Sequence, residues 1–200
     1  MKAQLDAHFW WFLARSSGII AWALLSASVI WGLVYASKMI PKKTAPRWLL
    51  DLHRFFGGLA VLFVGIHIAS LVLDSYVQFG LKELFVPLAS SWRPVAVAWG
   101  VLAFYLLIAV EVTSLAMARL PRRLWRRIHA ASFGVFALGS VHAIFAGTDA
   151  RNRLVIVFAL TALAVFTFAL SYRLIVAASP VPRARPVSTR RDDGRFSTPV

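Results

Sequence analysis

Four of the five histidines lie in or at the edge of long apolar stretches, where ionisable side chains are costly and are candidates for function. They form two spaced pairs: His53 and His67 are 14 residues apart, and His129 and His142 are 13 residues apart. Imidazole is a common ligand of metal ions and of haem iron. The chain has no cysteine, which excludes disulfides, thiolate metal sites, iron–sulfur clusters and covalently attached haem. Coordination by histidine is therefore the chemistry that these residues offer.

The stretches that carry the histidines have the composition of membrane spans. The chain is 60% hydrophobic and only 15% charged, whereas about a quarter of the residues of a typical soluble domain are charged. Each of five stretches is almost free of charge and long enough to cross a hydrocarbon core of about 30 Å as a helix. We predict an all-α, polytopic transmembrane helical bundle with spans at 16–37, 55–73, 94–118, 130–148 and 154–172.

The net charge of +14 is distributed unevenly along the chain. Lys and Arg gather in the first connection, the third connection and the C-terminal segment, and they are sparse elsewhere. The positive-inside rule then predicts an N-terminus outside and a C-terminus inside. The expected partner of the basic face is an acidic flavoprotein reductase or anionic membrane lipid, and not nucleic acid. We expect residues 1–178 to form one membrane domain, residues 179–200 to be a disordered basic cytoplasmic tail, and the protein to be a multi-pass protein of a bacterial plasma membrane.

This topology pairs the histidines by depth. His53 and His129 are at the cytoplasmic ends of the second and fourth spans, whereas His67 and His142 lie in their outer halves. The two layers are about 20 Å apart along an ideal helix. One histidine from each helix in each of two layers is the arrangement of two stacked bis-histidine haems b, with all four residues as iron ligands.

Helical phase agrees with this arrangement on one span only. On an ideal helix His53 and His67 differ by about 40°, whereas His129 and His142 differ by about 140°. We therefore expect the fourth span to tilt, kink or change its helical winding. Gly134 and Gly139, which lie between the two histidines, are the positions that would allow this irregularity.

Two simpler interpretations remain for the histidines. They are structural side chains bonded across the bundle, or they hold a mononuclear metal ion. A zinc or iron site needs three or four ligands at one depth, and the two predicted layers are too far apart for that. Two depth-matched pairs favour haem.

Haem propionates need cationic or hydrogen-bonding partners where water is scarce. We expect Arg54, together with Arg126 and Arg127, to serve the inner haem. Arg15, or Arg93, would serve the outer one. The alternative is that the loop arginines only mark topology. Glu111 lies inside the third span. We expect it to pair with a cation, to carry protons or to reach water at the inner end of the span.

The sequence resembles the ferric reductase-like transmembrane domain, a group that includes ferric reductases, NADPH oxidases and the haem-binding subunit of a methionine sulfoxide reductase system. The resemblance lies in the two histidine spacings and in the segments LDLHRFFGGLAVLFVGIHIASLVLD, FGLKELFVPLASSWRP and RRLWRRIHAASFGVFALGSVHAIFAGTD. It implies that His53, His67, His129 and His142 are axial haem ligands. Many members have six spans where five are counted here, and we expect this chain to lack the flavin- and nicotinamide-binding domain of the larger enzymes.

The resemblance implies an oxidoreductase component that moves electrons outward across the membrane. The expected donor is a cytoplasmic flavoprotein reductase, which would supply any flavin, or a quinol. The expected acceptor is ferric iron, oxygen or a partner enzyme at the outer face. Two other classes remain: a haem-free small transporter, although no inverted repeat of broken helices is evident, and a partner-docking membrane anchor, which leaves the histidines unexplained.

Overall fold

The regular structure of the protein is helical throughout the residues that the computed structural model describes, which are 2–37, 46–74, 79–149 and 151–178. Five helical segments are long and apolar enough to cross a membrane, which confirms the predicted all-α, five-span architecture. The elements in chain order are α1 (Lys2–Ala36), α2 (Trp48–Leu73), α3 (Leu81–Phe85), α4 (Pro94–Leu115), the 3₁₀ helix η1 (Met117–Arg119), α5 (Arg122–Ala130), α6 (Ser132–Ala146) and α7 (Arg153–Ala178).

Most of the helices extend beyond the uncharged stretches that predicted them. Span α2 begins at Trp48, two turns before residue 55, and α7 continues to Ala178. A charged side chain near a helix end can reach water, so charge marks the apolar part of a span and not the end of its hydrogen bonding. The segment 179–200, predicted to be a disordered tail, lies outside the described residues, as do Lys38, Lys42 and Lys43 of the first connection.

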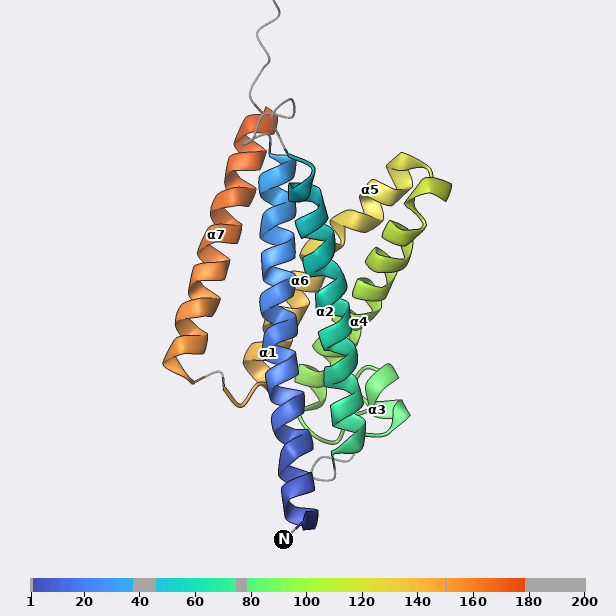
Figure 1. Cartoon of the computed structure of the whole chain (residues 1–200), viewed down its shortest axis with the longest axis vertical. Helices are drawn as coiled ribbons and strands as arrows, with labels where there is room; N and C mark the ends of the chain where they lie inside the picture. Colours follow the sequence, from blue (N-terminus) through green and yellow to red (C-terminus); the bar gives the residue numbers. More distant parts are fainter. Residues whose placement is uncertain (1, 38–45, 75–78, 150, 179–200) are drawn as a thin grey trace, which may run out of the picture.

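The spans form two closely packed antiparallel pairs, α1 with α2 and α4 with α6 (Figure 1). Helix α1 joins the pairs, because it also packs against α6 and α7. Its buried positions include several small residues, among them Ala14, Ser17, Ala21 and Ser28. Small residues allow helix backbones to approach closely in a membrane, where lipid gives no hydrophobic drive for association.

The fourth span is broken into two helices at Ala131. The Ala131 amide donates to the carbonyl of Ile128 at 2.9 Å, which is the tighter i→i+3 bond of a 3₁₀ turn. Helix α5 therefore leaves the axis of α6 at an angle (Figure 1). This is the irregularity that the 13-residue histidine spacing requires. It occurs at neither predicted glycine: Gly134 lies against Leu106 instead, and Gly139 against Leu25.

Candidate functional site

The four histidines form two facing pairs. The ring centroids of His53 on α2 and His129 on α5 are 5.9 Å apart, and those of His67 on α2 and His142 on α6 are 6.3 Å apart. Both pairs have an interplanar angle of 76°. The break at Ala131 thus allows both histidines of the fourth span to face α2.

Three of the four rings are fixed by a backbone carbonyl of a neighbouring helix. The Nδ1 of His67 lies 2.7 Å from the carbonyl oxygen of Ala14, and that of His142 lies 2.9 Å from the oxygen of Ala96. The Nδ1 of His53 lies 3.0 Å from the carbonyl oxygen of Ser28. An Nδ1–H that donates to a carbonyl leaves Nε2 with its lone pair, which is the tautomer that binds a metal.

His129 is held differently. Its Nδ1 lies 3.2 Å from the Ser114 hydroxyl on α4, and its ring stacks on Trp125 with centroids 5.0 Å apart and an interplanar angle of 24°. The hydroxyl can accept from Nδ1–H as a carbonyl does. All four imidazoles therefore have a partner at Nδ1.

A glycine lies beside each carbonyl-bound ring. A Cβ atom added to Gly100 would lie 2.7 Å from the Nδ1 of His142, one added to Gly18 would lie 3.0 Å from that of His67, and one added to Gly32 would lie 3.2 Å from the Cε1 of His53. Each glycine lies four residues, about one helical turn, after the residue whose carbonyl accepts from the ring. The missing side chain thus gives each imidazole room to reach the carbonyl one turn before.

Sequence reasoning did not identify these glycines, because it considered only glycines on the histidine-bearing spans. A signal was present on α1. Gly18 and Gly32 are 14 residues apart, as are the histidines they contact, and each ends a small-x-x-x-Gly pattern. In an antiparallel pair of helices, equal spacing keeps both contacts in register.

The spacing of the two imidazoles in each pair would fit a metal held between them, as in a bis-histidine haem. A metal–imidazole bond is about 2.0 Å long, and the centre of the ring lies about 1.1 Å from the nitrogen. Two rings that bind one metal from opposite sides therefore have centres about 6.2 Å apart. The observed 5.9 and 6.3 Å agree with this value. Within the described residues no three His, Asp or Glu side chains lie close enough together to hold a metal ion, and the four histidines are arranged as two pairs.

A cavity of about 540 Å³ adjoins the outer pair. It lies in the size range of small-molecule and cofactor sites. Its lining is mainly apolar and comes from α1, α2, α3, α4, α6 and α7 and the segments between them, with His67, His142, Arg15 and Asp149 among the polar residues. Phe136 is buried, lines this cavity and packs against Phe166.

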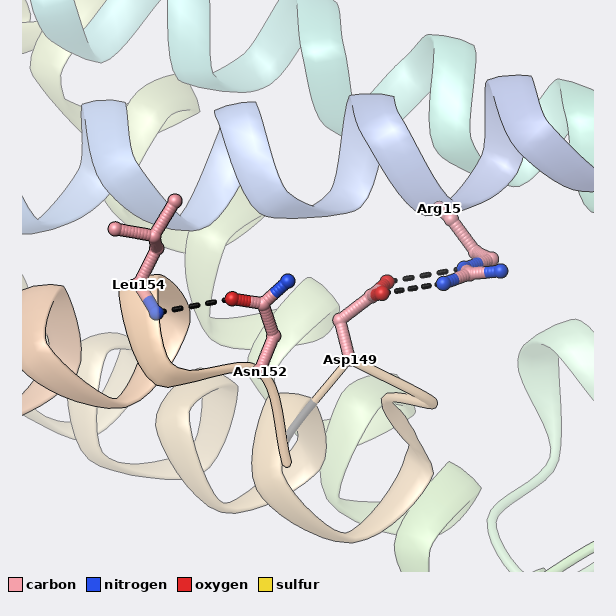
Figure 2. A network of polar contacts seen from close by, with 4 residues as sticks. All are labelled: Arg15, Asp149, Asn152 and Leu154. Atoms are coloured by element: carbon pink, nitrogen blue, oxygen red, sulfur yellow. Dashed lines mark hydrogen bonds and ion pairs between the residues drawn. The ribbon is translucent and has the colours of Figure 1, made fainter.

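Arg15 lies at this cavity but is engaged by another residue. Its guanidinium makes two hydrogen bonds to the Asp149 carboxylate, with Nε 2.9 Å from Oδ2 (Figure 2). This ion pair connects α1 to the segment between α6 and α7. Sequence reasoning missed the partner because the two residues are far apart in the chain. The role of Arg15 toward a propionate stays a prediction.

We predict that Asp149→Asn lowers thermal stability. Both side chains of the pair are largely shielded, with exposed fractions of 31% and 27%, so losing the charge-assisted bonds is expected to cost about 1–2 kcal/mol. The measurement is the melting temperature of purified protein in detergent. Asp51→Asn is the matched control, because its pair with Arg54 is 3.7 Å long and exposed. Equal melting temperatures for the two variants would contradict a structural role for the Arg15–Asp149 pair.

The other arginines predicted to hold propionates are placed less favourably. Arg54 is 61% exposed, and Arg126 and Arg127 are also exposed. Arg93 donates to the carbonyl of Phe145 at 2.6 Å. Their roles toward haem stay predictions.

Glu111 on α4 lies close to α2. A Cβ atom added to Gly57 of α2 would lie 3.3 Å from the Oε1 of Glu111.

Comparison with known protein families gives a match over residues 17–140 to the family model described as "Ferric reductase like transmembrane component". The matched range contains His53, His67 and His129 and ends two residues before His142. No curated protein and no solved structure matches the chain.

Proposed function

This chain belongs to the ferric reductase like transmembrane component family, and from that premise we propose that it carries electrons across a membrane through two bis-histidine haems b. Membership of the family and five apolar spans make it a multi-pass membrane protein of a family associated with transmembrane electron transfer. The proposal includes the identities of the cofactor, of the electron donor and of the electron acceptor.

The two facing histidine pairs are the observation that carries it. Neutral imidazoles with a partner at Nδ1 keep Nε2 available, and opposed rings about 6 Å apart leave room for one metal between them. Haem, when bound, supplies reversible one-electron oxidation and reduction of its iron. The carbonyls of Ala14, Ser28 and Ala96 would hold the ligand rings in one orientation in both oxidation states.

The pairs are separated along α2 by 14 residues, about 21 Å, so one lies toward each side of the bilayer. We propose that the pair of His53 and His129 faces the cytoplasm, where a flavoprotein reductase or a quinol delivers electrons. The pair of His67 and His142 would then face the outer side, where ferric iron, oxygen or a partner enzyme accepts them. The orientation rests on the basic residues of the connections.

The test uses full-length protein purified in detergent and then placed in vesicles. We expect a reduced-minus-oxidised spectrum of b-type haem, with about two haems per chain by pyridine haemochrome assay. In vesicles with ferricyanide trapped on one side, a chemical reductant on the other side is expected to reduce it only when the haem-loaded protein is present. Protein that binds no haem would overturn the proposal, as would haem-loaded protein that does not move electrons between the two sides.

A further inference from the structure

The indole of Trp125 combines two features that point to a bound group. It stacks on His129, one turn further along α5, with nearly parallel rings 5.0 Å apart. Its Nε1 is buried and has no hydrogen-bond partner within the described part of the chain. A buried N–H without an acceptor is expensive, by an amount comparable to the whole contribution of a good hydrogen bond.

Two other half-buried indoles of this bundle do have acceptors. The Nε1 of Trp31, at the same end of the bundle, donates to the carbonyl of Leu49 at 2.9 Å. The Nε1 of Trp22 donates to the hydroxyl of Ser140 at 2.9 Å. An unmatched buried donor beside a candidate ligand histidine points to an acceptor outside the described part of the chain.

The chemistry of haem limits which acceptor this can be. The pyrrole nitrogens bind the iron, so the polar groups left at the edge of haem b are its two propionate carboxylates. These need donors where water is scarce. The arginines near the inner pair are exposed, whereas Trp125 is a buried donor in contact with His129.

We propose that the Trp125 indole N–H donates a hydrogen bond to a propionate of the haem held by His53 and His129, an inference that rests on the proposed function. Trp125 is then a binding residue of the inner haem as well as a support for the orientation of His129. The bond disperses negative charge on the propionate. Losing it leaves more negative charge near the iron, which favours the ferric state.

The experiment compares Trp125→Phe with Trp31→Phe in full-length, haem-loaded protein. Phenylalanine keeps an aromatic ring against His129 and removes only the donor. Spectroelectrochemical titration should show about a tenfold decrease in the equilibrium constant for reducing the inner haem, which for one electron is about 59 mV. The outer haem should be unchanged. The inner component is the one that remains when His67 and His142 are both replaced by alanine.

A second measurement separates this role from a purely structural one. The largest g value in the electron paramagnetic resonance spectrum reports the relative orientation of the two axial imidazoles. We expect it to be unchanged in Trp125→Phe and shifted in Trp125→Leu, which removes the stacking as well. An unchanged inner-haem potential in Trp125→Phe overturns the inference, as does an equal change in Trp31→Phe.

If Trp125→Phe does not retain the inner haem, the dissociation constant from haem titration is the readout. An increase of about tenfold that Trp31→Phe does not share supports the bond, and a shared increase overturns it. Failure of the proposed function itself is seen earlier and separately, as wild-type protein without haem bands.

Discussion

Replacing His67 and His142 together by alanine is expected to lower the haem content from about two to about one per chain. The two rings face each other at 6.3 Å, and each is anchored to a carbonyl of a helix other than its own. With both imidazoles removed, the outer cavity keeps its apolar lining but loses the iron ligands. Electron transfer across vesicle membranes should fall to the protein-free background.

The measurement is the pyridine haemochrome assay combined with the reduced-minus-oxidised spectrum of each variant. The matched control is the reciprocal variant, in which His53 and His129 are replaced by alanine. It should also retain about one haem per chain, but with the other spectral component. If the bands of the His67/His142 double variant equal those of the wild type, these residues are not ligands and the two-haem interpretation is wrong.

Gly100→Ala is expected to weaken binding of the outer haem by about 10- to 100-fold, the usual cost of disturbing a group that orients a metal ligand. The added Cβ would lie 2.7 Å from Nδ1 and 2.8 Å from Cε1 of His142. Real Cβ atoms do not approach so closely, so the ring or the helix must shift, and we expect the bond of the ring to the carbonyl of Ala96 to weaken. The substitution changes no ligand, which separates orientation of the ring from coordination.

The neighbouring glycines provide a graded series and two controls. The effect should decrease from Gly100 to Gly18 and then Gly32, because the corresponding Cβ contacts lengthen from 2.7 to 3.0 and 3.2 Å. Alanine at Gly58 or Gly65 on α2 would meet nothing within 4 Å. These two variants should bind haem like the wild type, and alanine is the better helix former. Equal haem affinity for Gly100→Ala and Gly58→Ala would show that the space beside His142 is not needed.

The spans and the histidine pairs could be predicted from sequence because both depend on residue type alone. A segment in lipid must be apolar whatever its neighbours are, and His53, His67, His129 and His142 are conspicuous in apolar surroundings. The lipid requirement also explains why all five spans were found although their ends were not.

The anchoring of the rings could not be predicted in the same way. Every residue has a carbonyl, so no residue type marks Ala14 or Ala96 as the acceptor for a histidine. An irregularity in the fourth span was expected from the spacing of His129 and His142, but its position at Ala131 was not, because alanine itself gives no indication of a helix end. The pairing of Arg15 with Asp149 depends on the packing of the whole bundle.

The use of main-chain carbonyls as acceptors affects how natural sequence variation in this protein should be interpreted. A substitution at Ala14 or Ala96 leaves the carbonyl oxygen that the imidazole needs, so its effect would come from the packing of these buried positions and not from loss of the acceptor. Gly18 and Gly100, one turn later, are sensitive for another reason. A side chain there would enter the space beside the ring of His67 or His142. A ranking of positions by side-chain hydrogen bonds alone would therefore overlook Gly18 and Gly100, although the imidazoles of His67 and His142 need the space beside them.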